Sequence, residues 1–233
     1  MTDRVTLITA ASRGMGAACA RQLAERGDRL VLLARSPEVE ELAAGIGALA
    51  VRGSVDDPDA LRRLVETALT RHGRIDAVVA NTGHAAKGDL LELTDREWHD
   101  GFDLLLMLAI RLSRLAVPSM LERGAGAFVN ISSFSAIEPA LRFPVSAVAR
   151  AGLGAFAKLF AQRFGAHGLR MNNVLPGWID THPVDAAEIE RIPGGRPGSA
   201  DEVARVVAFL ASDDASYVNG ESLLVDGGLV RAI

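Results

Sequence analysis

Short apolar runs alternate along the chain with longer segments in which apolar residues recur at helical spacing. Several short runs are apolar throughout, which is typical of strands buried on both faces. The pattern therefore predicts an α/β fold with a doubly wound, parallel, seven-stranded sheet and helices on both faces. The expected strands are Val5–Thr9, Leu30–Ala34, Leu49–Val51, Ala77–Ala80, Ala127–Ile131, Met171–Leu175 and Ser222–Val225. The expected helices are Met15–Arg26, Pro58–Arg71, Asp95–Glu122, Ala147–Phe164 and Ala200–Ser212.

The composition fits one globular domain over residues 1–233. Hydrophobic residues make up 49% of the chain and charged residues 23%, so a sizeable core can be buried. No repeat, low-complexity tract or linker interrupts the pattern. The net charge of −4, without a run of Lys or Arg, argues against nucleic acid and anionic membranes as partners. Cys19 is the single cysteine, which excludes an internal disulfide and a cysteine-based zinc site.

The distribution of apolar residues also bears on location. The longest uninterrupted apolar run, Leu104–Ile110, is too short to span a bilayer. The polar start Met1–Arg4 leads directly into the first expected strand, without the pattern of a signal peptide. We therefore expect a cytoplasmic protein with no membrane partner.

A glycine-rich turn, Thr9-Ala10-Ala11-Ser12-Arg13-Gly14-Met15-Gly16, joins the first expected strand to the first expected helix. Such a turn lets backbone N–H groups and the positive end of a helix meet a diphosphate. Two nearby glycines at a strand–helix turn are common, so this motif alone does not identify a site.

Further motifs follow in order along nearly the whole chain. They are Ala80-Asn81-Thr82-Gly83, Val129–Ser133, Pro176–Thr181, Asp201–Ala204, Phe209–Ser212 and Val225–Gly228. This ordered set resembles the short-chain dehydrogenase/reductase family, at the size of bacterial 3-oxoacyl-carrier-protein reductases. The resemblance implies a single Rossmann-type domain, a nicotinamide dinucleotide, a small-molecule substrate, and homodimers or homotetramers formed through the long helices. The segments Leu104–Ile110 and Ala151–Phe160 support an oligomer, because they are apolar over most of their circumference.

The resemblance also implies which positions contact the cofactor. These are Ser12, Arg13, Gly14, Met15, Gly16, Arg35, Val55, Asn81, Gly83, Arg150, Pro176, Gly177, Ile179 and Thr181. Two positions depart from the family pattern: Ala10 stands where the first turn glycine is usual, and Ser54 where an aspartate meets the adenine.

The end of the second expected strand bears on the choice of nucleotide. An acid about 20 residues past the glycine turn would select NAD by binding the ribose 2′-hydroxyl. The chain instead reads Leu33-Ala34-Arg35-Ser36, and Arg35 and Arg13 are able to clamp a 2′-phosphate. We therefore expect NADP(H). The alternative is that both arginines are ordinary solvated surface charges.

The resemblance implies a catalytic set of Asn, Ser, Tyr and Lys, of which the chain keeps only the serine, Ser133. The Tyr-x-x-x-Lys motif should begin thirteen residues later, where Ser146 replaces tyrosine and Arg150 replaces lysine. The asparagine position is Leu105, and the single tyrosine, Tyr217, lies in a turn before the last expected strand. Ser133, Ser146 and Arg150 are therefore the candidate catalytic residues.

The missing phenol has chemical consequences. A serine hydroxyl is shorter than a tyrosine side chain and a far weaker acid than a phenol, whose pKa is near 10. Loss of a positioned acid commonly costs about 10²–10⁴-fold in rate. We expect Ser133 and Ser146 to face one another across the cleft, with Arg150 beneath them, and an ordered water to bridge them.

Other polar residues near this expected cleft have two interpretations. His84 and His182 could each supply a proton near neutral pH, although a solvent-exposed loop histidine is the plainer interpretation of each. Glu138 and Arg142 lie in a loop that normally faces substrate, but we expect them to be solvated charges. The lid, His182–Arg191, is short, so we expect a relatively open cleft.

Three functions remain open. The first is an NADPH-dependent reductase with altered proton delivery, acting on a quinone or conjugated carbonyl or through a bound water. The second is a non-redox enzyme that binds an anion or oxyanion with Ser133, Ser146 and Arg150. The third is a pseudo-enzyme that binds nucleotide or a partner subunit without turnover.

Overall fold

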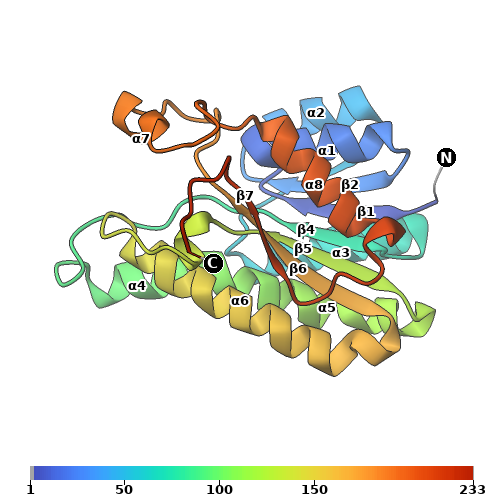
Figure 1. Cartoon of the computed structure of the whole chain (residues 1–233). Coiled ribbons are helices and arrows are strands. Elements are labelled where there is room, and N and C mark those ends of the chain that lie inside the picture. Colours follow the sequence, from blue (N-terminus) through green and yellow to red (C-terminus); the bar gives the residue numbers. More distant parts are fainter. Residues whose placement is uncertain (1–2, 233) are drawn as a thin grey trace.

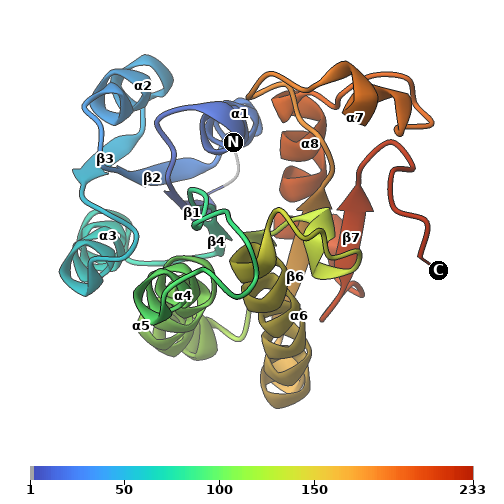
Figure 2. The same ribbon diagram turned by 90° about the vertical axis from the view of Figure 1, so that its left-hand side faces the viewer.

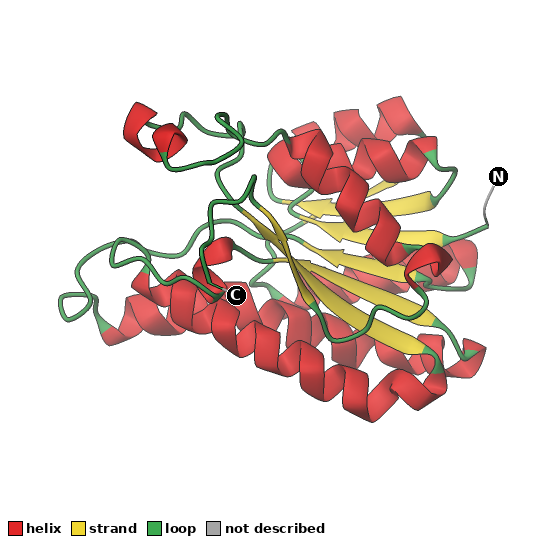
Figure 3. Ribbon diagram, viewed as in Figure 1, coloured by secondary structure: helices red, strands yellow, loops and turns green. Residues whose placement is uncertain are grey.

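The computed structural model describes residues 3–232, which form one seven-stranded sheet covered by helices (Figures 1 and 3). The strand order is β3-β2-β1-β4-β5-β6-β7, and every neighbouring pair is parallel. This confirms the predicted α/β architecture. The strands are β1 (Val5–Thr9), β2 (Arg29–Ala34), β3 (Leu49–Arg52), β4 (Ala77–Ala80), β5 (Gly126–Ile131), β6 (Leu169–Pro176) and β7 (Ser222–Val225).

Helices cover both faces of the sheet, as Figure 2 shows in a view onto the ends of the strands. One face carries α1 (Gly14–Glu25), α2 (Glu38–Ile46) and α8 (Ala200–Ala211), and the other α3 (Pro58–His72), α5 (Leu108–Arg123) and α6 (Pro144–Phe164). Each face has its own apolar core. Phe128 and Leu7 belong to the core under α3, α5 and α6, and Ile8 and Leu32 to the core under α1, α2 and α8.

The long helix predicted over Asp95–Glu122 is divided in the structure. It consists of α4 (Asp95–Phe102), a π-helical turn (Asp103–Met107) and α5. Such turns are rare in helices and occur frequently at functional sites. The periodicity of the sequence could not reveal it, because one inserted residue shifts the hydrophobic stripe without breaking it.

Two helices were not predicted from the sequence. Helix α2 buries only Val39 and Ala43, and α7 (Ala186–Glu190) has no buried residue, so neither produces a clear apolar stripe. The other helices begin and end close to their predicted limits. Helix α6 begins at Pro144, three residues before the prediction, because proline is well tolerated in the first turn of a helix.

One helical run, Asp95–Arg123, is long and apolar enough to cross a membrane by length and composition alone. In the fold its apolar face packs on the sheet, where Leu108, Leu112, Ala116 and Met120 are buried. Core helices of soluble proteins pass the same test. The packing accounts for the apolar character of this helix without a membrane.

Candidate active site

The loops that carry the sequence motifs meet at the carboxyl edge of the sheet, which faces the viewer in Figure 2. Chain order reverses at β1, which has β2 on one side and β4 on the other. In open parallel sheets, ligands bind outside the carboxyl ends of the strands at such a switch point. The turn between β1 and α1 begins there.

This turn is tightly folded and braced by the loop after β4. A Cβ at Gly16 would lie 2.3 Å from the Ala10 carbonyl oxygen and 2.7 Å from Asn81 Nδ2. Asn81 Nδ2 donates to that carbonyl (3.1 Å), and the Thr9 hydroxyl is hydrogen-bonded to the Asn81 backbone. Ala10 adopts a φ of +47°, so it retains the left-handed conformation that the usual glycine would supply.

The amino end of α1 is open to a ligand. Arg13 occupies the N-cap position without a side-chain cap, and no acid lies in the first turn. The first backbone N–H groups of a helix have no partner within the helix and attract anions. Thr181, on the loop after β6, lies 3.3 Å from the Cβ position of Gly14 and limits the turn on its outer side. The close packing at Gly16 and the uncapped helix end fit a dinucleotide diphosphate.

Three arginines surround the carboxyl ends of β2 and β3. Arg35 and Arg13 are exposed, and the Arg35 carbonyl accepts a hydrogen bond from Arg52 Nη2 (3.2 Å). Glu38 lies among them: a hydrogen bond from Ser36 lowers the pKa of this carboxyl, and Arg13 and Arg52 lower it further. Arg52 was not predicted from the sequence, although its place at the end of β3, the strand beside β2, could have indicated it.

The remaining predicted cofactor positions lie along the same edge. Val55 is buried just after β3, whereas Gly83 is exposed after β4. A hollow between α1 and α2 is lined by residues that include Ser12, Glu38 and Leu42. The segment after β6 also reaches this edge. It contributes Gly177, Ile179 and Thr181, and Pro176 is the last residue of β6 itself. The half-buried Met15 lies in the first turn of α1.

Arg150 is the buried centre of the candidate catalytic group. It is 7% exposed, and its guanidinium donates from Nε to Ser146 Oγ (3.2 Å) and from Nη1 to the Ile131 carbonyl (2.9 Å). Burial lowers the pKa of Arg150 to about 10. Among residues 3–232, no carboxylate forms an ion pair with it. The site therefore contains a desolvated cation without an acidic partner.

Ser133 is placed differently from Ser146. Its hydroxyl accepts hydrogen bonds from the backbone N–H of Ser135 (3.3 Å) and from Ser135 Oγ (3.2 Å). Within the described part of the chain, no direct hydrogen bond joins Ser133 to Ser146. The structure thus brings Arg150 to Ser146, while the Ser133 hydroxyl is held within its own turn.

The other positions of the family's catalytic set give no replacement acid. Leu105, at the asparagine position, is 3% exposed and lies inside the π-helical turn. That turn contacts the loop after β4, because Thr82 Oγ1 donates to the Leu104 carbonyl (3.3 Å). Tyr217 is fully exposed and precedes the amino end of β7, at the opposite edge of the sheet from the site.

His84, after β4, and His182, after β6, lie in contact at the carboxyl edge of the sheet. Their Nε2 atoms are 3.2 Å apart, and their ring centroids are 5.2 Å apart. Burial lowers the pKa of His84, and the positive charges of His182, Lys87 and Arg150 lower it further. Both are exposed loop residues, as the plainer interpretation expected, but the sequence did not indicate that they lie in contact.

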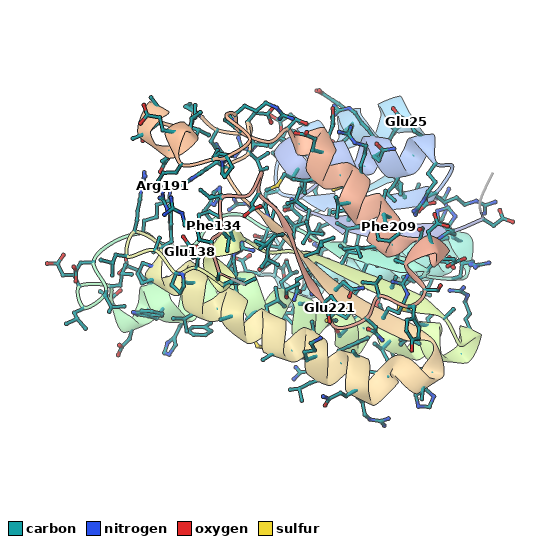
Figure 4. The ribbon with its side chains drawn as sticks, in the orientation of Figure 1. Glu25, Phe134, Glu138, Arg191, Phe209 and Glu221 are labelled. Atoms are coloured by element: carbon teal, nitrogen blue, oxygen red, sulfur yellow. The ribbon has the colours of Figure 1, made fainter. Side chains whose placement is uncertain are left out.

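The lid is connected to the loop between β5 and α6. Arg142 Nη1 lies 3.5 Å from Glu188 Oε1, and Arg191 Nη2 lies 3.8 Å from Glu138 Oε1. Figure 4 shows Arg191 and Glu138 near one another. Glu138 also accepts from the backbone N–H of Arg231 (2.9 Å). Glu138 and Arg142 are thus paired rather than merely solvated. The short lid therefore makes two ion pairs with this loop.

An aromatic group lies under these ion pairs. Trp178, which follows β6, packs between Phe134 (5.7 Å between ring centroids) and Phe143 (6.2 Å), and Lys87 Nζ lies 5.2 Å from the Phe143 ring centroid. Neither Trp178 nor Lys87 was predicted as a site residue from the sequence. No local motif marks them, since the fold brings them together from separate loops.

Comparisons with known proteins cover almost the whole chain. A family model described as enoyl-(acyl carrier protein) reductase matches residues 9–230. The 3-oxoacyl-(acyl-carrier-protein) reductase of Salmonella typhimurium is 33% identical over 97% of both chains. Cis-4-hydroxycyclohexanecarboxylate dehydrogenase of Sinomonas cyclohexanicum is 37% identical over 97% of this chain and 96% of that protein. The L-sorbose reductase of Gluconobacter frateurii, solved with NADPH and L-sorbose, superposes with a TM-score of 0.90 at 29% identity and covers 99% of this chain and 97% of its own.

Proposed function

The chain belongs to the short-chain dehydrogenase/reductase family, and on that premise we propose that it is an NADPH-dependent reductase of an activated carbonyl or quinone-like small molecule. One contrast carries the proposal. The turn around Gly16 keeps the packing that a dinucleotide diphosphate needs, whereas the position of the family's phenol holds Ser146, bonded to Arg150. The relative solved with NADPH supports the choice of cofactor.

The proposed cofactor site uses residues of this chain in defined roles. The backbone of the turn from Ser12 to Gly16 and the amino end of α1 would bind the diphosphate. Arg35 and Arg13 would bind a 2′-phosphate, and Arg150 the ribose hydroxyls beside the nicotinamide. When bound, NADPH supplies a hydride to the substrate.

The nature of the acceptor follows from what the protein lacks. A simple ketone becomes a strongly basic alkoxide as hydride arrives, so its reduction depends on a well-placed acid. A quinone or conjugated carbonyl spreads the developing charge over several atoms and depends on that acid less. The Arg150 guanidinium would stabilise this charge in a site of low dielectric. Activated acceptors are therefore the substrates that this set of residues serves best.

A second candidate function rests on one observation: buried Arg150 has no carboxylate partner within residues 3–232. Such a cation favours an anion or oxyanion, and a non-redox enzyme could use it together with Ser146. The two proposals differ in whether an acceptor causes NADPH to be oxidised. A protein that binds nucleotide without any turnover would instead be a pseudo-enzyme.

We also propose that the protein is a cytoplasmic homodimer or homotetramer. Val148 and Leu159 on α6 are 49% and 62% exposed, and they leave an apolar outer face on a helix whose inner face packs on the sheet. A second copy of the chain would cover this face. Light scattering of the purified protein tests this assembly directly.

The native protein should bind NADPH more tightly than NADH, and Arg35→Asp should narrow or reverse that preference. The substitution removes a cation and sets a carboxylate against the 2′-phosphate, with Glu38 already nearby. We expect NADPH affinity to fall about tenfold or more, a change of about 1.4 kcal/mol, while NADH affinity changes little. Calorimetric titration with both nucleotides measures the preference.

The control for this experiment is Arg205→Asp, which makes the same charge change on an exposed position of α8. It should leave the ratio of the two affinities unaltered. Equal affinity of the native protein for NADPH and NADH would contradict the role given to Arg13 and Arg35.

A further inference from the structure

Two histidines from distant parts of the chain form one contact beside the candidate site. His84 follows β4, and His182, 98 residues later, begins the lid after β6. At an Nε2–Nε2 distance of 3.2 Å, one ring donates its N–H and the other accepts with a lone pair. The contact is compatible with a neutral pair or with a pair that carries one extra proton. Two protonated rings would bring two donors and two charges together.

The surroundings of the pair favour release of that proton. The charged groups that act on His84 are His182 on the lid, Lys87 on the same loop and Arg150 from α6, and all of them repel a proton. Together with burial they lower the pKa of His84, which makes its imidazolium a stronger acid. The burial is partial, since both residues keep contact with solvent, which can return the proton after each reaction.

The position of the pair matches what the proposed substrate class needs. Arg150 is buried, whereas His84 and His182 are exposed on loops that follow β4 and β6 at the same edge of the sheet, and the charge of Arg150 acts on His84. In a conjugated carbonyl, the oxygen that gains charge lies several bonds from the carbon that takes hydride. A donor for that oxygen therefore need not stand at Ser146.

We propose that the His84–His182 pair is the proton donor of this enzyme and delivers its proton to the oxygen of a conjugated carbonyl or quinone. The inference rests on the proposed function. Hydride, with two electrons, forms a C–H bond at the carbon of the C=C bond farther from the carbonyl. The C=C π electrons then form a new C=C bond to the carbonyl carbon, and the C=O π electrons move to oxygen. That oxygen forms an O–H bond with the imidazolium proton. Oxidised dinucleotide and a neutral imidazole pair remain, and water protonates the pair again.

The test compares His84→Gln and His182→Gln with the native protein in the NADPH-dependent reduction of a small quinone. Glutamine keeps a polar side chain of similar length but does not titrate between pH 5 and 8. The native rate should fall as pH rises, because the protonated pair is lost. His84→Gln should lose this dependence and be slower by about tenfold or more near pH 6, whereas His182→Gln, which keeps His84, should shift the dependence to higher pH. The control is His167→Gln, an exposed histidine between α6 and β6 at the other edge of the sheet.

A second measurement needs no nucleotide. Nuclear magnetic resonance follows the ring signals of His84 as pH changes, and His182→Gln should raise the pKa of His84 because it removes one of the repelling groups. His167→Gln should leave the titration of His84 unchanged. A His84 titration that does not respond to His182→Gln would overturn the coupling on which the proposal depends.

The outcomes separate this inference from the proposed function. If the native protein reduces the quinone and both histidine variants keep its rate and pH profile, the proton-donor assignment is wrong and the reductase function stands. If the native protein does not oxidise NADPH with the quinone at any pH, the proposed function fails, and the inference falls with it.

Discussion

The double variant Ser146→Tyr/Arg150→Lys should reduce a simple ketone with NADPH about 10²-fold faster than the native protein. Position 146 is half-buried in the first turn of α6, and its hydroxyl already contacts the side chain at position 150 one helical turn away. A phenol there, beside a lysine ammonium, restores a proton donor that reaches the substrate oxygen. The gain requires that the cofactor already binds productively, which the packing of the glycine turn supports.

The double variant also changes the packing. The larger tyrosine enters a half-buried position, and lysine cannot reproduce the planar contacts of Arg150 with Ser146 and the Ile131 carbonyl. We expect a loss of about 1–3 kcal/mol in the free energy of unfolding, measured by urea denaturation. The matched control is Arg150→Lys alone, which should give no gain in ketone reduction. A native protein that already reduces simple ketones as fast as the double variant would contradict the importance given to the missing phenol.

Gly16→Ala should lower nucleotide affinity by more than about tenfold, about 1.4 kcal/mol, and reduce stability as well. The added methyl would lie 2.3 Å from the Ala10 carbonyl oxygen, a backbone atom, so the turn or α1 must move. The turn already holds Ala10 in the left-handed conformation, and Asn81 is bonded to the same carbonyl. Little freedom remains to relieve the clash locally. Nucleotide titration and urea denaturation together measure both effects.

The matched control for this substitution is Gly154→Ala, within α6, where an added Cβ meets only Ser222 Oγ, at an ordinary contact distance of 3.8 Å. Alanine is the better helix former by about 0.8–1 kcal/mol, so this variant should be slightly stabilised and bind nucleotide normally. If Gly16→Ala behaved like Gly154→Ala, the turn would not be the tightly packed site described above.

The sheet could be predicted because its strands are buried on both faces. Continuous apolar runs such as Val5–Thr9 and Ala77–Ala80 have no other economical explanation, and their limits are those of β1 and β4. The π-helical turn at Asp103–Met107 and the five-residue α7 escaped prediction. The π-helical turn leaves the apolar stripe of the long helix unbroken, and α7 buries no residue. The periodicity of the sequence therefore reveals neither element.

The candidate site was predictable where its residues lie in one motif and not where the fold joins separate loops. The contact between Arg150 and Ser146 follows from their spacing of one helical turn. The His84–His182 contact, the ion pairs of Glu138 and Arg142, and the packing of Trp178 depend on the path of the lid. Single-sequence patterns carry no information on that path.

The most direct test of the proposed function is the rate at which the native protein oxidises NADPH, measured with a small quinone and with a saturated cyclic ketone of similar size. The proposal predicts steady oxidation of NADPH with the quinone. With the ketone it predicts a rate lower by a factor of at least about 10², because only the ketone depends on the absent phenol. No oxidation with either acceptor, or equal rates with both, would contradict it.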